Sequence, residues 1–224
     1  MILTHPRHTM ISPKIGLILA CEKSGGIGYK DELPWQLTKE FDYYKSISKN
    51  ALVICGKGTF AEQNLFKNHY AKFFVVSRSN SDEMISKGNQ ITESGHAYQF
   101  CTSVEKAIQQ AKAEVKPELD QKILIIGGAP IYDYCFREKL ADYCLITRID
   151  ENFKFDKKIA LDDLQKNYSK IDVKNTKGFN KILAEDVTRD VEPMINLQEE
   201  INKKTNQVVK YFVEVYAVKK ETDL

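Results

Sequence analysis

Residues 15–20 read Ile-Gly-Leu-Ile-Leu-Ala, a short apolar run that is typical of a buried β-strand. Similar runs rich in β-branched or aromatic side chains recur at residues 52–55, 73–76 and 123–126, with stretches of helical pattern between them. Strands that alternate with helices form crossover units, in which the strands run parallel and helices cover both faces of the sheet. The sequence therefore predicts an α/β fold with a mainly parallel central sheet.

The pattern changes toward the end of the chain. Residues 143–148, 181–186 and 209–218 are predicted strands with less helix between them, so the sheet should end with an antiparallel strand. Between the first and the second half, Thr102 to Glu105 form a predicted capping box. It is followed by an apolar helical stripe, whose residues are Val104, Ala107, Ile108, Ala111 and Val115.

Residues 187–207 form a polar stretch that is predicted to be an insertion into the last hairpin. Pro193 could open a short helix there, with Met194, Leu197 and Ile201 on one side. No internal repeat or flexible linker marks a second domain. We expect one domain at residues 14–220, preceded by an extension at 1–13 and followed by a tail at 221–224. The insertion offers a possible surface for a protein partner.

The composition excludes several classes of protein. The formal net charge is only +2 and there is no dense basic run, which argues against a nucleic-acid partner. The five scattered cysteines resemble reduced core thiols, and neither they nor the four histidines have metal-ligand spacing, so no metal is expected. The apolar run at 15–21 is too short to cross a bilayer. We expect no membrane partner and a cytoplasmic location; an organelle-targeting segment at residues 1–13 is the alternative.

A glycine-bearing segment, residues 25–35, follows the first predicted strand and reads Gly-Gly-Ile-Gly-Tyr-Lys-Asp-Glu-Leu-Pro-Trp. Its three glycines permit unusual backbone angles or the close approach of a ligand, so it is predicted to be a mobile surface loop covering a site. An ordinary turn would also need glycines, and the strict dinucleotide fingerprint is absent.

Glu40 follows Trp35 by five residues, near the start of a predicted helix with Phe41, Tyr44 and Ile47 on an apolar stripe. A carboxylate at this position can simply face water, where the helix dipole favours it. Alternatively, it points into an apolar cleft, where desolvation would raise its pKa and suit it to proton transfer.

Two further predicted strands end in glycine just before a predicted helix, at Gly56-Lys57-Gly58-Thr59 and at Gly127-Gly128. Each could be a simple turn. Backbone N–H groups at such positions also bind phosphate at the carboxyl edge of a parallel sheet. Lys57, and Arg78 after the third strand, add positive charge at this edge, so together the three strand ends favour a phosphorylated cofactor.

From about residue 15 to 219 the chain resembles the dihydrofolate reductase family. The resemblance rests on the order and spacing of several short motifs: Ile27-Gly28, Leu33-Pro34-Trp35, Glu40, Gly56-Lys57 with Thr59, Ser77-Arg78, Ile126-Gly127-Gly128 through Tyr132, Thr147-Arg148-Ile149 and the closing strand at 211–216. It implies NADPH-dependent reduction of 7,8-dihydrofolate to tetrahydrofolate, with hydride transfer to C6 and protonation at N5. It also implies a dihydrofolate reductase-like sheet of about eight strands and a place in one-carbon metabolism.

The resemblance also implies roles for individual residues. Glu40 would bind the pterin edge and support protonation, with Thr147 bracing its carboxylate, Trp35 holding a water and Leu33 completing the catalytic set. The residues expected to bind the substrate are Ile18, Glu40, Phe41, Tyr44 and Thr147, with Ala20 and Leu33 also lining the ring pocket. The residues expected to bind NADPH are Ala20, Ile27, Gly28, Gly56, Lys57, Thr59, Ser77, Arg78, Ile126, Gly127, Gly128, Ile131 and Tyr132.

The chain departs from the family where the glutamate tail of folate would bind. Ala71 stands where the family has an arginine, with Tyr70 and Lys72 beside it, and Lys72 could restore the charge but not the fork of a guanidinium. Gln63 and Asn64 replace apolar residues, and residues 156–159 read Asp-Lys-Lys-Ile. Two alternatives therefore stay open: a reductase of a pterin without the tail, or a weakly active or inactive relative that serves as a subunit of a larger assembly.

Overall fold

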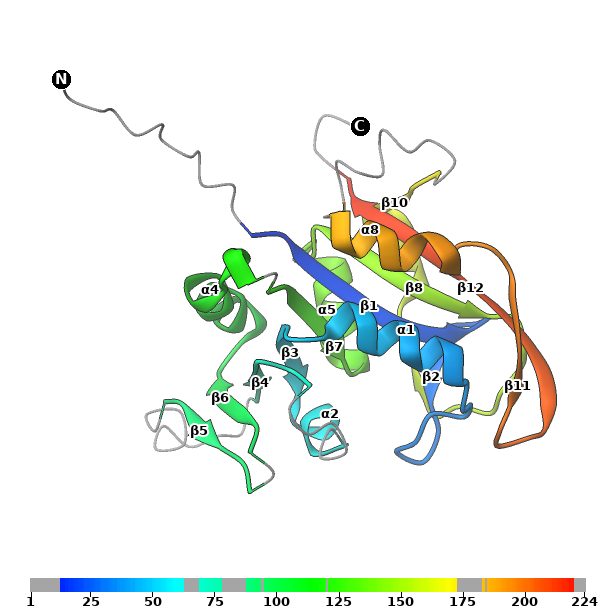
Figure 1. Ribbon diagram of the computed structural model, residues 1–224, viewed down its shortest axis with the longest axis horizontal. Helices are drawn as coiled ribbons and strands as arrows, with labels where there is room; N and C mark the ends of the chain where they lie inside the picture. Colours follow the sequence, from blue (N-terminus) through cyan, green and yellow to red (C-terminus); the bar gives the residue numbers. More distant parts are fainter. Residues whose placement is uncertain are drawn as a thin grey trace.

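A computed structural model describes residues 13–62, 69–77, 88–93, 95–119, 121–172, 183 and 185–219 (Figure 1). Within these residues, ten strands form one sheet in the order β10-β12-β8-β1-β7-β3-β4-β6-β5, with β11 beside β12. Its strands are β1 Ile15–Glu22, β3 Leu52–Gly56, β4 Lys72–Val76, β5 Gln90–Ile91, β6 Ala97–Cys101, β7 Ile123–Gly127, β8 Tyr143–Ile149, β10 Tyr168–Lys170, β11 Gln198–Asn202 and β12 Gln207–Val218. A second, two-stranded sheet pairs β2 (Gly26–Gly28) with β9 (Lys157–Lys158).

The predicted fold class is confirmed. The central strands β8, β1, β7, β3, β4 and β6 are parallel, and β12 closes the sheet antiparallel to β8. The sheet has more strands than expected because β5 and β10 are edge strands of only two and three residues. Such short runs carry too few residues for an alternating pattern to stand out.

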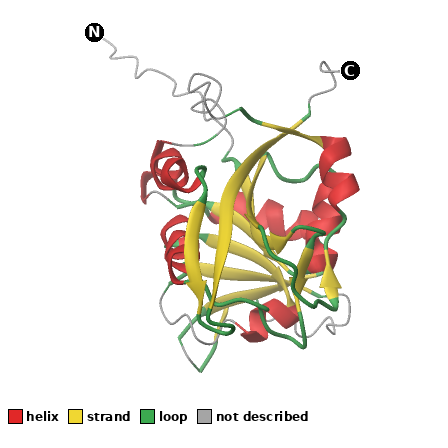
Figure 2. Cartoon of the chain, turned by 90° about the vertical axis from the view of Figure 1, so that its right-hand side faces the viewer, coloured by secondary structure: helices red, strands yellow, loops and turns green. Residues whose placement is uncertain are grey.

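Helices cover both faces of the sheet (Figure 2). The helices are α1 Thr38–Ser48, α2 Lys57–Glu62, α4 Val104–Glu114, α5 Ala129–Arg137, α6 Leu161–Asn167 and α8 Glu185–Val191, with 3₁₀ turns η2 Pro117–Leu119 and η3 Glu192–Met194. Successive residues of a strand point to opposite faces. Leu17 and Leu19 accordingly pack with α4 and α5, whereas Ile18 packs with α1 and α8.

Where the structure describes residues 181–186, they do not form the strand that was expected. Glu185 and Asp186 begin α8, while residues 181, 182 and 184 lie outside the described part of the chain. Val187 and Val191 are buried four residues apart, so they share one face of a helix and pack beside α1. This spacing of four is that of a helix and not that of a strand.

The short helix expected at Pro193 is present only as the 3₁₀ turn η3, which ends at Met194. Leu197 follows η3 in a loop, and Ile201 lies in β11, where its side chain is exposed and the next residue, Asn202, is buried. Alternation along a strand thus replaces the predicted helical face. At α4 the predicted buried stripe is confirmed for Val104, Ala107, Ile108 and Ala111, whereas Val115 follows the helix and is only partly buried. The N-cap is Ser103 rather than Thr102, since the Ser103 hydroxyl accepts a hydrogen bond from Lys106 N.

Candidate active site

Glu40 lies in the first turn of α1 and is buried, with 8% of its surface exposed. The Thr147 hydroxyl, on β8, donates a hydrogen bond to Glu40 Oε1 at 3.0 Å. Burial raises the pKa of Glu40 to about 7, the hydrogen bond from Thr147 opposes that rise, and the negative charge of Glu200 adds to it. Glu40 therefore faces the interior of the protein rather than water, and its carboxyl group can both hold and release a proton near neutral pH.

The face of α1 that surrounds Glu40 differs from the predicted stripe. Its buried residues include Tyr43 and Ile47, whereas Phe41 is exposed and stacks on the half-buried Tyr44. The Tyr44 hydroxyl pairs with that of Tyr70 at 2.7 Å. Glu40, Tyr43 and Ile47 lie three and four residues apart, so they form the true inward face of the helix.

Residues from β1 lie beside this acid. Ala20 is the register partner of Thr147, and Ile18 is buried against α1. Trp35 is also buried and contacts the ring of Phe153 at 5.6 Å between centroids, and its indole N–H has no partner among the described residues. Leu33 is half exposed. Of the expected catalytic residues, Trp35, Glu40 and Thr147 are thus buried, whereas Leu33 lies at the surface.

The glycine-bearing segment is more ordered than a simple loop. Gly26–Gly28 form β2, and Gly28 O accepts a hydrogen bond from Asp156 N at 3.0 Å. A Cβ atom on Gly26 would lie 2.4 Å from the ring of Phe155, so only glycine permits this close approach. Ile27 packs against the core. The segment after β1 is therefore held against residues 155–158 by pairing.

The glycines at the ends of β3 and β7 meet at one place. A Cβ atom on Gly56 would lie 3.6 Å from Ile131 and 4.0 Å from Gly127 O, and one on Gly128 would lie 3.3 Å from Thr59 Oγ1. Gly127 has a φ of +100° and packs against the ring of Tyr132, whose hydroxyl donates to Ile18 O at 2.9 Å. These glycines form a cradle that brings the ends of β3 and β7 close together at the start of α5, a position whose backbone N–H groups suit a phosphorylated cofactor.

The remaining expected cofactor residues differ in placement. Ile126 and Ser77 are buried, Lys57 is exposed at the start of α2, and Arg78 lies outside the described residues. Ser77 N donates to Cys101 O at 3.0 Å.

Lys72 does not replace the arginine that the family has near this position. Its side chain is buried on the face of the sheet that α4 covers, where Nζ is 2.7 Å from Glu114 Oε1 and 3.0 Å from Gln99 Oε1. It also lies over the ring of Phe74. Ala71 packs on the same core cluster, and Gln63 and Asn64 lie outside the described residues. Lys72 therefore points into the core beneath α4.

Two polar residues near Glu40 were missed. Tyr211 of β12 is fully buried, and Glu200 of β11 binds the first turn of α1. Neither has a local sequence signal, because both meet α1 from more than 150 residues away along the chain.

All five cysteines are buried and free, as expected of core thiols. Among the described residues, no helix is long and apolar enough to span a bilayer. The same part of the chain holds no cluster of three or more His, Cys, Asp or Glu residues that could bind a metal ion.

Several known proteins that are similar to this chain are dihydrofolate reductases. A family model described as dihydrofolate reductase matches residues 14–184. Dihydrofolate reductase type 9 of Escherichia coli is 29% identical over 151 residues, covering 66% of this chain and 76% of that protein. Dihydrofolate reductase of Saccharomyces cerevisiae is 27% identical over 148 residues, covering 62% and 65%. The structure of the Enterococcus faecalis dihydrofolate reductase complexed with NADP(H) and RAB-propyl superposes with a TM-score of 0.61 at 17% identity, covering 93% of this chain and 98% of that one.

Proposed function

The chain belongs to the dihydrofolate reductase family, and from this premise we propose that it is an NADPH-dependent oxidoreductase that reduces 7,8-dihydrofolate to tetrahydrofolate. The observation that carries the proposal is the buried Glu40 carboxyl group with Thr147 bonded to it. A binding or structural subunit has no need for a desolvated acid whose pKa is close to 7.

NADPH would supply the hydride that is transferred to C6 of the pterin. The residues that would bind it are the glycine cradle at Gly56, Gly127 and Gly128, with Thr59, Ile131 and Tyr132 around it. Ala20, Ile27, Gly28, Ile126 and Ser77 would complete the set. Lys57 and Arg78 would provide positive charge for phosphates, including the adenosine 2′-phosphate that separates NADPH from NADH.

The protein's part of the reaction is to bind, orient and protonate. Glu40 would hold the amino-pyrimidine edge of the pterin and support delivery of a proton to N5, while Thr147 keeps its carboxyl group in place. Ile18, Phe41 and Tyr44 would contact the ring system, with Leu33 at its mouth. The buried indole N–H of Trp35 has no partner among the described residues, which suits it to hold a water beside the acid. Activity should fall as pH rises through about 7, because Glu40 then loses its proton.

The direct test is NADPH oxidation in the presence of 7,8-dihydrofolate. Glu40→Gln keeps the shape of the side chain but removes the ionisable group, and we expect kcat to fall by roughly 10²–10⁴. Asp42→Asn is the matched control, since Asp42 lies on the same helix with an exposed side chain paired to Lys45. Absence of turnover by the folded wild-type protein, or an unimpaired Glu40→Gln variant, would contradict the proposal.

A second candidate, the reduction of a pterin without a glutamate tail, is favoured by one observation. Lys72 is bound by Glu114, and Ala71 carries no charge, so neither offers a cation to the tail. Comparing kcat/KM for dihydropterin and dihydrofolate separates the two substrates: similar values indicate that the tail contributes little binding energy. Calorimetry with NADPH tests the third possibility, a subunit without catalysis, which would bind none.

A further inference from the structure

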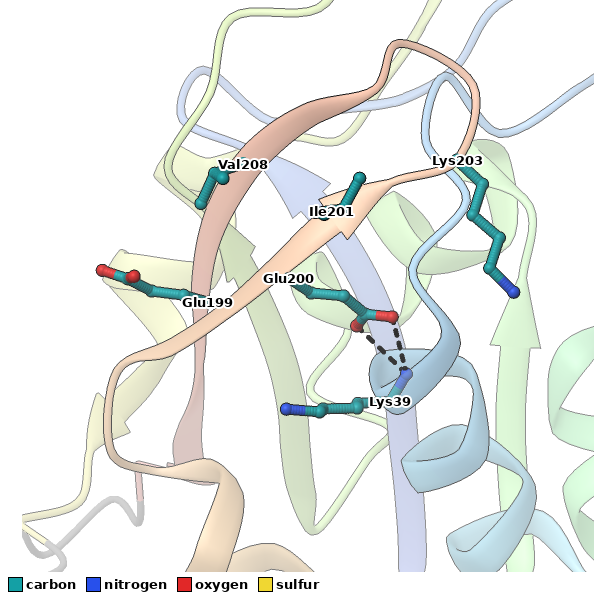
Figure 3. Close-up of a pocket in the computed structure, with 6 residues that line it drawn as sticks. All are labelled: Lys39, Glu199, Glu200, Ile201, Lys203 and Val208. Carbon is teal, nitrogen blue, oxygen red and sulfur yellow. Dashed lines mark hydrogen bonds between the residues drawn. The ribbon is translucent and has the colours of Figure 1, made fainter.

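The N-terminus of α1 is capped by a residue from a distant strand. The helix begins at Thr38 after Leu37, whose apolar side chain cannot accept a hydrogen bond. The backbone N–H groups of a helix's first turn need acceptors from elsewhere. Here the Glu200 carboxylate accepts from Thr38 N, and it accepts from Lys39 N at 3.1 and 3.0 Å through its two oxygens (Figure 3).

Glu200 is itself held in place by Tyr211 of β12. The buried Tyr211 hydroxyl donates to Glu200 Oε2 at 3.1 Å. Burial raises the pKa of Tyr211 and the charge of Glu200 raises it further, whereas a hydrogen bond with the backbone of Glu40 lowers it. The Tyr211 hydroxyl therefore contacts both Glu200, which caps the helix, and the backbone of Glu40, the candidate acid.

The rest of the β11–β12 hairpin reinforces the contact. Asn202 is fully buried, and its Oδ1 accepts a hydrogen bond from Gln36 N at 3.0 Å. Lys203 N donates to Gln36 O at 3.1 Å, and Lys204 Nζ donates to Leu33 O at 2.7 Å. The hairpin and the segment that leads into α1 thus form one hydrogen-bonded unit.

We propose that Glu200 is a positioning residue for Glu40, because its carboxylate caps α1 from the β11–β12 hairpin and fixes the helix turn that carries the acid. This inference rests on the proposed function. A carboxylate stabilises a helix N-terminus by accepting hydrogen bonds and by interacting with the dipole. Small displacements of a reacting group cost large factors in rate, so loosening this turn should lower kcat more than it changes substrate binding.

Glu200 also acts on Glu40 through its charge. The groups that the structure relates electrostatically to the Glu40 carboxyl are Thr147, Glu200, Tyr43 and Tyr211. Thr147 is an uncharged donor, and both tyrosines have pKa values raised by burial, so they are neutral near pH 7. Glu200 is therefore the negative charge in this set that favours the protonated form of Glu40.

The experiment compares Glu200→Gln, Glu200→Ala and the control Glu199→Gln. Glu199 is the adjacent residue of β11, but its side chain points away from α1 and pairs with Lys210 at 3.1 Å (Figure 3). Glu200→Ala should lower kcat by about tenfold, with a smaller change in KM. Glu200→Gln keeps an acceptor for the cap, so its loss should be smaller. The high-pH limb of the activity profile of Glu200→Gln should move by roughly half a pH unit to lower pH.

Trp35 gives a readout that does not depend on activity, since it is the single tryptophan of the chain and is buried just before α1. Glu200→Ala should shift its emission to longer wavelength as the segment loosens, whereas Glu199→Gln should not. If both Glu200 variants match Glu199→Gln in kcat, pH midpoint and emission, the inference is overturned. If the wild-type enzyme reduces no dihydrofolate, the proposed function fails, and the emission comparison alone decides whether Glu200 holds the segment.

Discussion

Thr147 Oγ1 lies 3.0 Å from Glu40 Oε1, and this hydrogen bond joins the sheet to the first turn of α1 inside the protein. The bond favours the ionised form of Glu40, while burial and Glu200 favour the protonated form. The pKa of about 7 is a balance of opposed contributions, so removing either kind of contribution should move it in a known direction.

Thr147→Val removes the donor and keeps the shape of the side chain. The pKa of Glu40 should rise further, because a hydrogen bond to the charged form is lost. The high-pH limb of kcat/KM should therefore move to higher pH, opposite to the shift expected for Glu200→Gln. Denaturation should show a loss of about 1–3 kcal/mol. Profiles measured at constant ionic strength check the direction, and a shift to lower pH would contradict the assigned balance.

Glu40→Gln should stabilise the protein in alkaline but not in acidic solution. In the unfolded chain Glu40 titrates near 4.5, and in the folded protein near 7. Between these values the folded state keeps a proton that the unfolded state has lost, so wild-type stability falls as pH rises through this window. The full penalty, of the order of 3 kcal/mol, is present above pH 7.

Urea denaturation of wild type and Glu40→Gln at pH 4 and pH 8 measures this difference. The variant should gain about 2–3 kcal/mol over wild type at pH 8 and almost nothing at pH 4, where both states are protonated. Asp42→Asn is again the control, because its exposed carboxylate should produce no such contrast. An equal difference at both pH values would show that Glu40 is not desolvated.

The central strands could be predicted because they are buried on both faces. Residues such as Val53 and Ile54 pack on opposite faces of β3, so the strand is continuously apolar and stands out in the sequence. Where burial is one-sided, the sequence was less informative. Residues 185–191 contain β-branched side chains, yet Val187 and Val191 face the core from a helix.

Part of the candidate site could be predicted from the order and spacing of short motifs. Trp35, Glu40 and Thr147 stand in a recognisable order and spacing. The apolar stripe on α1 was predicted to include Phe41, but Tyr43 is buried instead. Which of these two side chains faces the core depends on how the helix lies against the sheet. Glu200 could not be predicted, since its partners are backbone N–H groups, which every sequence contains. Only the folded hairpin brings its carboxylate to α1.

Gly127→Ala should disrupt the cradle between β7 and α5. The residue has a φ of +100°, and an added Cβ would lie 2.6 Å from the ring of Tyr132. Both the backbone strain and the clash should destabilise the protein, by about 2–4 kcal/mol together, and the KM for NADPH should rise. Gly58→Ala is the control for stability, because no atom of the described residues lies within 4 Å of its added Cβ in α2. Equal stability of the two variants would contradict the geometry at Gly127.

Lys72→Met should lower stability without changing how dihydrofolate binds. The Lys72 side chain is 7% exposed and its ammonium group is bound by Glu114 and Gln99 on the face covered by α4, so its loss breaks a partly buried charge pair. We expect a loss of about 1–3 kcal/mol. The KM for dihydrofolate should stay within about twofold of wild type, a difference of only ~0.4 kcal/mol, because the side chain points away from α1. Lys112→Met, an exposed lysine in the last turn of α4, controls for loss of one positive charge. A selective rise in KM for dihydrofolate over dihydropterin in Lys72→Met would instead assign Lys72 to the glutamate tail.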